Sequence, residues 1–250
     1  MEVAQHIAAL RRDGEGLADA VERAGLDAAV PTCPGWSVRD LVRHVGGVHR
    51  WATGYVAEQR TEMWDADLDE IVGAWPQDAE LLQWFREGHA ALAAALDDAD
   101  PALVCWTFLT APSPLAMWAR RQAHETAIHR VDAERAAGVT PSFPPDFAAD
   151  GIDELLTCFI TRRGSRLRSE PAVTLRVRCE PAGGDWLVHI GADGVQTAPG
   201  SDGDADCEVR GAASHLYLTL WNRQPPDDLA VSGDANELAL FLDRVRIRWS

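Results

Sequence analysis

The spacing of apolar residues changes once along this chain of 250 residues, at the loop GVTPSFPPD that begins at Gly138. Before the loop, apolar residues recur at steps of three and four, which is typical of amphipathic helices. After the loop we expect one helix over 146–162, followed by runs in which apolar and polar residues alternate as in half-buried strands. We therefore predict an α+β protein of two domains, 1–142 and 143–250, joined near residues 138–146.

The first domain is expected to contain four long helices. The second of these follows the sequence Pro-Gly-Trp, and Ser37 with Asp40 three residues later forms a variant of the capping box that starts a helix. Because nothing between the helices alternates as a strand does, we predict a four-helix bundle. The helices are expected over 3–25 and 37–57, from Pro76 through Leu96, and over 114–138.

The second domain is expected to mix short strands with helices. Val173, Leu175 and Val177 alternate with polar residues, and the turn PAGGD at 181–185 leads into a second run of the same period, so we predict a hairpin. Further strands are expected over 194–198, 206–210 and 229–232, with helices over 212–222 and 236–243.

The charge of the chain argues against two classes of partner. With 23 basic and 39 acidic residues the net charge is -16, and no basic stripe is found along the sequence. Such a chain repels phosphate backbones and anionic lipid surfaces. We therefore expect no nucleic-acid or membrane partner.

The sequence also bears on location and on thiol chemistry. No stretch of 18 apolar residues is found, and the amino terminus, with its acidic second residue, does not resemble a secretory signal. We expect a cytoplasmic protein, as a monomer or small homo-oligomer. The five cysteines include no C-x-x-C pair, and we expect reduced, mostly buried thiols without a chemical role.

The segment RRQAHETAIHRVDAE, at 120–134, contains candidate metal ligands. Glu125 and His129 are four residues apart, so on a helix they lie about 40° apart on one face and can share an ion. His124 and Glu125 suggest the zinc-protease motif H-E-x-x-H. However, His124 and His129 are five residues apart, about 140° around the helix, and cannot hold one ion together.

A third ligand must come from another helix, because catalytic zinc sites usually have three protein ligands. His44 and His49 are also five residues apart, so we expect at most one of them to face the bundle axis. His44 shares its face with Leu41 and Val45 and is the candidate. A buried histidine is more often a hydrogen-bonded core residue than a ligand, so spacing alone leaves both interpretations open. The remaining candidates in this domain are expected to be structural or on the surface: His49, His89 and His124.

Two longer segments carry a family resemblance. PTCPGWSVRDLVRHVGGV, followed about eighty residues later by RRQAHETAIHRVDAE, resembles the mycothiol-dependent maleylpyruvate isomerase family, whose amino-terminal domain is a DinB-like helical bundle. DADCEVRGAASHLYLTLWNR followed by LAVSGD resembles the carboxy-terminal domain of that family, which is similar in fold to sterol carrier proteins. The resemblance implies a divalent metal ion, with zinc expected, held by His44, Glu125 and His129.

The resemblance also implies roles for two further residues. Asp132 follows the last ligand as in the family pattern and could orient an adjacent group; an exposed ion pair with Arg135 is the alternative. Arg223 matches a recurrent arginine of the family and could bind a substrate carboxylate while closing over the cleft between the domains. It could equally be a cation at the end of a helix, where the helix dipole favours it.

The implied activity depends on a small thiol. The free coordination position of the metal would hold the thiol of mycothiol as a thiolate, which adds to a cis unsaturated keto acid in an isomerase or attacks another small electrophilic substrate in an S-transferase. Ergothioneine is an alternative thiol. Two other functions stay open: a non-catalytic protein that binds a small molecule or lipid, and a metal-dependent hydrolase of the DinB-like superfamily.

Overall fold

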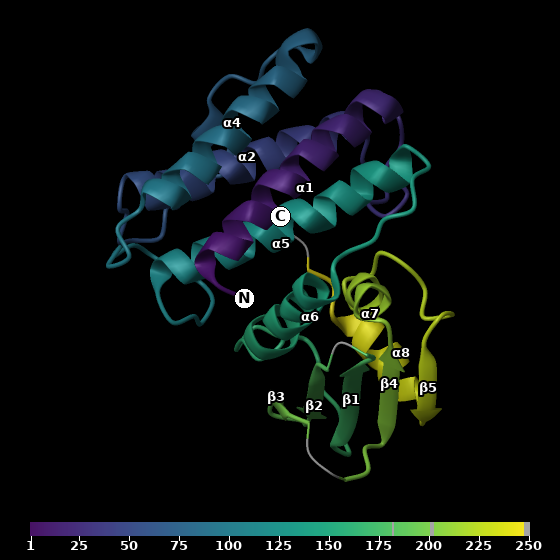
Figure 1. Ribbon diagram of the computed structural model, residues 1–250. Coiled ribbons are helices and arrows are strands. Elements are labelled where there is room, and N and C mark those ends of the chain that lie inside the picture. The colour runs from purple at the N-terminus through teal and green to yellow at the C-terminus, as the bar shows by residue number, and fades with distance from the viewer. Residues whose placement is uncertain (182, 201–202, 248–250) are drawn as a thin grey trace. The chain divides into compact units, whose positions relative to one another are not determined.

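The computed structural model describes residues 1–181, 183–200 and 203–247, and it divides into two compact units, Met1–Pro141 and Ser142–Ser250 (Figure 1). The first unit is helical and the second combines a sheet with helices, which confirms the predicted α+β class. Ala182, in the predicted turn over 181–185, lies outside the described residues.

The first unit is the predicted four-helix bundle. In Figure 1 its long helices run alongside one another, and α1 contacts α5 while α2 contacts α4. A short helix, α3 (Leu68–Val72), was not predicted. The long helices are α1 (Val3–Ala24), α2 (Val38–Ala57), α4 (Asp78–Asp98) and α5 (Pro114–Ala136).

Side-chain caps set the beginnings of two helices that matter for the site. The backbone N–H of Asp40 donates to Ser37 Oγ at 3.3 Å and that of Ser37 donates to Asp40 Oδ2 at 2.8 Å, so the predicted capping box of α2 is confirmed. At the start of α5, Ser113 Oγ accepts from the N–H of Ala116 at 3.1 Å, and Pro114 occupies the first turn, where no N–H is needed. These caps fix where α2 and α5 begin.

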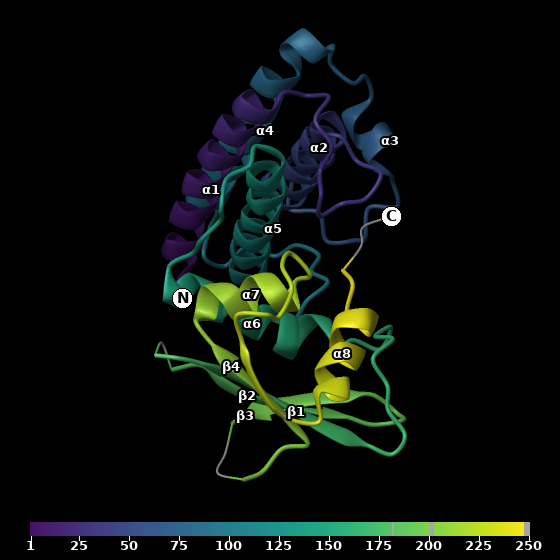
Figure 2. The same cartoon turned by 90° about the vertical axis from the view of Figure 1, so that its right-hand side faces the viewer.

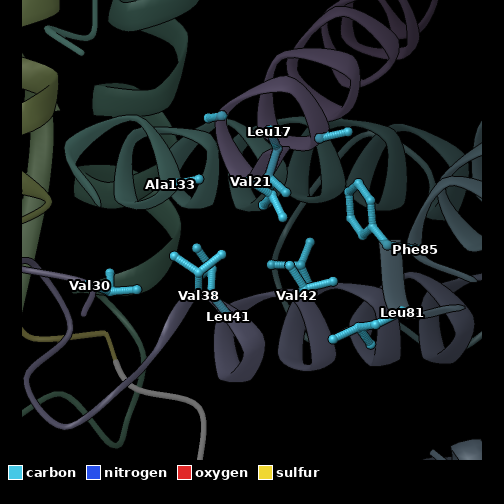
Figure 3. Packing of buried hydrophobic residues seen from close by; sticks show 12 residues of the cluster. Leu17, Val21, Val30, Val38, Leu41, Val42, Leu81, Phe85 and Ala133 are labelled. Atoms are coloured by element: carbon cyan, nitrogen blue, oxygen red, sulfur yellow. The ribbon is translucent and has the colours of Figure 1, made fainter. Parts of the chain in front are cut away.

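Apolar side chains from all four long helices form the core of the bundle. Figure 3 shows these side chains pointing toward one another between the helices. Leu17 and Phe85, for example, are fully buried. The labelled members are Leu17, Val21, Val30, Val38, Leu41, Val42, Leu81, Phe85 and Ala133.

The second unit is built on a five-stranded sheet with the strand order β3-β2-β1-β4-β5, in which only β1 and β4 are parallel. Figure 2 shows α6, α7 and α8 on one face of this sheet. The elements are α6 (Pro145–Asp153), η1 (Glu154–Phe159), β1 (Val173–Cys179), β2 (Asp185–Ile190), β3 (Val195–Pro199), β4 (Cys207–Gly211), α7 (Ala213–Leu220), β5 (Ala230–Gly233) and α8 (Ala235–Arg244).

The helix predicted over 146–162 is interrupted. The α-helical part ends at Asp153, and the next turn, η1, is a π-helix. Thr157 Oγ1 donates to the carbonyl of Asp153 at 2.7 Å, a side-chain bond that competes with the helical backbone pattern. The wider turn ends at Phe159.

The alternation predicted for β1 fails at one residue. Arg176 is buried although it lies on the opposite face from Leu175 and Val177. Its guanidinium donates to Asp185 of the neighbouring strand at 2.9 and 2.6 Å. These two hydrogen bonds compensate the charge of the buried guanidinium, so Arg176 is buried although it is polar.

Among the described helices, none combines the length and the apolar character that a membrane span requires.

Candidate metal centre

The packing of α2 against α5 brings the three predicted ligands together. His44 lies on α2, and Glu125 and His129 lie one turn apart on α5. Glu125 Oε1 is 3.4 Å from His44 Nε2 and 3.2 Å from His129 Nε2, and the potential ligand atoms of the three residues all lie within 4.8 Å of one another. Glu125 and His129 are buried and His44 is nearly so.

Asp132 holds the ring of His129 from the side away from this cluster. Its Oδ2 is 2.8 Å from His129 Nδ1, and because a carboxylate can only accept, Nδ1 carries the proton. Asp132 is fully buried and also accepts from Thr32 Oγ1 at 2.5 Å and from Cys33 Sγ at 3.5 Å. The alternative of an exposed pair with Arg135 is therefore wrong. Asp132 orients His129 so that Nε2 faces the other ligands.

Arg121 forms a hydrogen bond with the second oxygen of the Glu125 carboxylate. The two residues lie four apart on α5, and Arg121 Nη2 donates to Glu125 Oε2 at 3.3 Å inside the bundle. Glu125 Oε1 is the oxygen near both histidines. The carboxylate therefore presents one oxygen to the cluster and the other to a buried cation.

Trp36 packs beside the two ligand rings. Its ring centroid lies 5.1 Å from that of His44 and 6.4 Å from that of His129, nearly parallel to the latter at 15°. Trp36 is itself partly exposed. The indole thus places an apolar wall between the cluster and solvent on this side.

The electrostatic surroundings favour the charged forms of two of the three predicted ligands, His129 and Glu125. Burial alone lowers the pKa of His129, but hydrogen bonds to Asp132 and Glu125 outweigh it and raise this pKa to about 9. Burial alone raises the pKa of Glu125, but its hydrogen bonds to His129 and His44 hold this pKa well below the usual range. The metal-free site therefore contains an imidazolium between two carboxylates near neutral pH.

The residues fit a divalent ion. Two imidazole nitrogens and one carboxylate oxygen are a ligand set that zinc takes in catalytic sites, where a fourth position is left for water or substrate. The carboxylate that holds the far nitrogen of His129 is the usual partner of a metal-bound histidine. Both the set of donor atoms and the carboxylate partner of His129 thus match a metal centre.

The expectation that only one of His44 and His49 faces inward is wrong. His49 is fully buried, and its Nε2 lies 2.9 Å from Thr126 Oγ1 on α5. Its ring also packs against Phe85 and His89 of α4, at 5.5 and 5.6 Å between centroids. Because α2 packs against both α4 and α5, two sides of this helix are buried.

The other predicted structural histidines are buried as well. His89 Nε2 is 3.0 Å from the carbonyl oxygen of Leu10 on α1. His124 is fully buried, and its ring lies edge-on to that of His6, 6.1 Å away. His124 therefore points toward α1 and His129 toward α2, which agrees with the exclusion of a zinc-protease motif.

Arg223 belongs to the second unit, just beyond α7. Its backbone N–H donates to the carbonyl of Leu218 at 2.7 Å, and its guanidinium Nη1 donates to the carbonyl of Trp221 at 3.0 Å. Bonds to carbonyls at the end of a helix fit the alternative of a helix-terminal cation. A role in binding a substrate carboxylate stays a prediction.

Four residues of this centre were not singled out as functional from the sequence: Thr32, Cys33, Trp36 and Arg121. The first three lie in the segment PTCPGW directly before α2, so their position beside a helix that carries a candidate ligand was the available signal. Arg121 lies four residues before Glu125, a spacing at which helix side chains meet. The five cysteines, all of them described, form no disulfide.

Two family profiles match the chain. One, for the mycothiol maleylpyruvate isomerase N-terminal domain, matches residues 7–134. The other, for the C-terminal domain of the same family, matches residues 146–240. The search of curated protein sequences gives no match.

Solved structures show a likeness of fold. The crystal structure of a mycothiol-dependent maleylpyruvate isomerase aligns over 93% of this chain and 93% of that chain, with a TM-score of 0.63 and 16% sequence identity, and a histidine-to-alanine mutant of it gives the same values. A UbiJ-SCP2 ubiquinone synthesis protein aligns over 39% of this chain and 92% of its own length at 27% identity, with a TM-score of 0.30, too low to support an argument. The first likeness shows the fold alone.

Proposed function

Because the chain belongs to the mycothiol maleylpyruvate isomerase family, we propose that it is a metal- and thiol-dependent isomerase or S-transferase that acts at His44, Glu125 and His129. One observation carries the proposal. Potential ligand atoms of these three residues, from two different helices, lie within 4.8 Å of one another in the interior of the bundle. We propose zinc as the ion and mycothiol as the thiol, with ergothioneine as the alternative.

The residues of the centre have separate tasks in this proposal. When bound, the zinc ion supplies a Lewis acid that lowers the pKa of a thiol. Asp132 keeps the proton of His129 on Nδ1 and so leaves Nε2 available, and Arg121 fixes the carboxylate of Glu125. Trp36 limits the access of water to the two histidines.

Two reactions use the same thiol sulfur. In an isomerase, the sulfur adds to the double bond of a cis unsaturated keto acid, rotation follows about the resulting single bond, and departure of the sulfur restores the double bond as trans. In an S-transferase, the sulfur bonds to an electrophilic carbon and the leaving group departs with the electron pair. An anionic substrate would need a cation, which in a chain without lysine is an arginine or the metal ion itself, and Arg223 is our candidate arginine.

The first test is native mass spectrometry of the wild type and of His44→Ala after incubation with zinc. We expect one ion per chain in the wild type and none in the variant, while His189→Ala, which removes an exposed histidine of β2, keeps the ion. The second test follows the absorbance of maleylpyruvate with mycothiol, with ergothioneine and without thiol. A wild type that binds no metal, or turnover that does not depend on a thiol, contradicts the proposal.

A further inference from the structure

The second unit contains a cavity of about 860 Å³ that belongs to none of the residues discussed so far as functional. This volume lies within the range of small-molecule binding sites in proteins. Its walls come from the end of η1 with the loop that follows, and from the end of α8 with the segment beyond it.

The floor of the cavity is apolar and well packed. Phe159, Ile160 and Val245 line it, and each is at most 6% exposed. The ring of Phe159 packs edge-on against that of Trp221, with centroids 5.6 Å apart. Asn222 Nδ2 donates to the carbonyl oxygen of Val245 at 2.7 Å and so fixes the second wall. These contacts hold the apolar floor of the cavity in place.

The rim of the cavity is positively charged in a chain whose net charge is -16. Four arginines line the cavity, and Asp243 is the only acidic residue among the lining residues that the structure describes. Asp243 contacts two of these arginines, at 3.4 and 3.9 Å, yet the side chains of both remain more than half exposed. The arginines are Arg162, Arg166, Arg244 and Arg246.

The cavity adjoins the π-helical turn. A π-helix is rare and is often found at functional sites. Here the turn ends at Phe159, which lies on the cavity floor, and the loop beyond it carries Arg162 and Arg166. The irregular turn thus places an aromatic ring and two cations on the same wall.

We propose that this cavity binds a small organic anion, with a carboxylate or phosphate group held by the arginines and an apolar body on Phe159, Ile160 and Val245. Guanidinium groups bind both carboxylate and phosphate through paired hydrogen bonds, so the chemistry of the rim fits either group. The apolar floor selects anions that also carry a hydrophobic part. This site is separate in composition from the proposed metal centre, since it uses residues of the second unit alone.

The experiment is isothermal titration calorimetry with the full chain carrying His44→Ala and kept metal-free, so that no anion binds through a metal ion at that centre. The probes are 2-naphthoate, 2-naphthyl phosphate, inorganic phosphate and 2-naphthylmethylammonium. We expect the two naphthyl anions to bind, inorganic phosphate to bind at least about tenfold more weakly than naphthyl phosphate, and the cation not to bind. The two naphthyl anions distinguish a carboxylate ligand from a phosphate ligand.

A pair of matched double variants locates the binding. Arg244→Gln with Arg246→Gln should weaken both naphthyl anions at least about tenfold, since each substitution removes a charge-assisted donor. Arg163→Gln with Arg210→Gln removes two exposed arginines that do not line the cavity and should leave the affinities within about twofold. Circular dichroism checks that both variants are folded. Absence of binding by both naphthyl anions, equal binding of the naphthyl cation, or unchanged affinity in the folded Arg244 and Arg246 variant overturns the proposal.

Discussion

His129 Nδ1 and the Asp132 carboxylate lie 2.8 Å apart within one turn of α5, so the ring of His129 is oriented by its own helix. Thr32 and Cys33, from the segment before α2, hold the same carboxylate in turn. The orientation of one proposed ligand thus depends on α5 and on the segment that precedes α2. This arrangement leads to predictions about metal affinity, protonation and stability.

The affinity for zinc should depend on pH above neutrality. Because hydrogen bonds raise the pKa of His129 to about 9 in the metal-free protein, an ion must displace a proton from this ring to bind. We expect the apparent affinity to rise about tenfold for each pH unit between pH 7 and 8.5, the change for one released proton. Competition with a chelator of known pH dependence measures it. A constant affinity in this range, as for a histidine with an ordinary pKa, would contradict the prediction.

Removing the charge of Asp132 should weaken metal binding without removing a ligand. Asp132→Asn keeps the size of the side chain but loses the anion that stabilises and orients His129. We expect the affinity for zinc to fall about 10- to 100-fold, as is usual for the partner of a metal-bound histidine. Asp19→Asn, an exposed change on α1, is the control. Equal affinities of the two variants for zinc would show that Asp132 is only structural.

The metal-free protein should lose stability in acid because of His49. Burial keeps the pKa of His49 well below 6.5 in the folded state, whereas the unfolded chain takes up a proton near pH 6.5. The unfolded state therefore binds more protons, so the stability due to neutral His49 is present above pH 6.5 and lost as pH falls below it.

Denaturant unfolding between pH 7 and 5 measures this effect by comparing wild type with His49→Gln. We expect the free energy of unfolding of the wild type to fall by up to about 1.4 kcal/mol more per pH unit below pH 6.5 than that of the variant. His189→Gln, at an exposed position, should keep the wild-type slope. Parallel curves for wild type and His49→Gln would mean that His49 titrates normally.

Two glycines of α1 should respond differently to alanine. A Cβ at Gly14 would lie 2.2 Å from the ring of His89, which is buried and bonded to Leu10. We expect Gly14→Ala to lower the free energy of unfolding by about 1–3 kcal/mol through overpacking. At Gly16 the nearest atom is Arg130 Cδ, 2.9 Å away, on a side chain that pairs with Asp13 and Glu134. We expect Gly16→Ala to change the free energy of unfolding little, because the higher helix propensity of alanine, worth up to about 1 kcal/mol, offsets the shift that Arg130 must make. Thermal unfolding of both variants tests the contrast.

The parts of the fold set by local pattern could be predicted from the sequence. Long apolar stripes gave four helices, and the four-residue spacing of Glu125 and His129 put them on one face, as the structure confirms. The short helix α3 could not be recognised from a stripe, because its five residues bury nothing; the capping box of Asp67 and Glu70 was its only signal. The π-turn also has no distinct sequence signal, because the side-chain bond of Thr157 to Asp153 has a counterpart at Thr53, where α2 stays regular.

The parts set by partners distant in sequence could not be predicted. We expected at most one of His44 and His49 to face inward, because we assumed that α2 has one buried side. Contacts of α2 with both α4 and α5 bury a second side, which carries His49. Arg176 was expected on the surface because it alternates with apolar residues, and the expectation failed because its partner, Asp185, lies on another strand. Thr32 supports His129 through Asp132, and Thr32 and Asp132 are 100 positions apart. Such contacts appear only once the helices and strands are placed.

The division of the proposed ligands between α2 and α5 has a consequence for assembly. His44 and Glu125 are separated by 81 residues of sequence, which include α3 and α4. An ion held by both would close this long loop as a covalent crosslink does, and the ends of a long loop meet at a high entropic cost in the unfolded chain. The three residues come together only after α2 and α5 have packed against each other. Metal binding would therefore follow the folding of the bundle and would then stabilise its folded state.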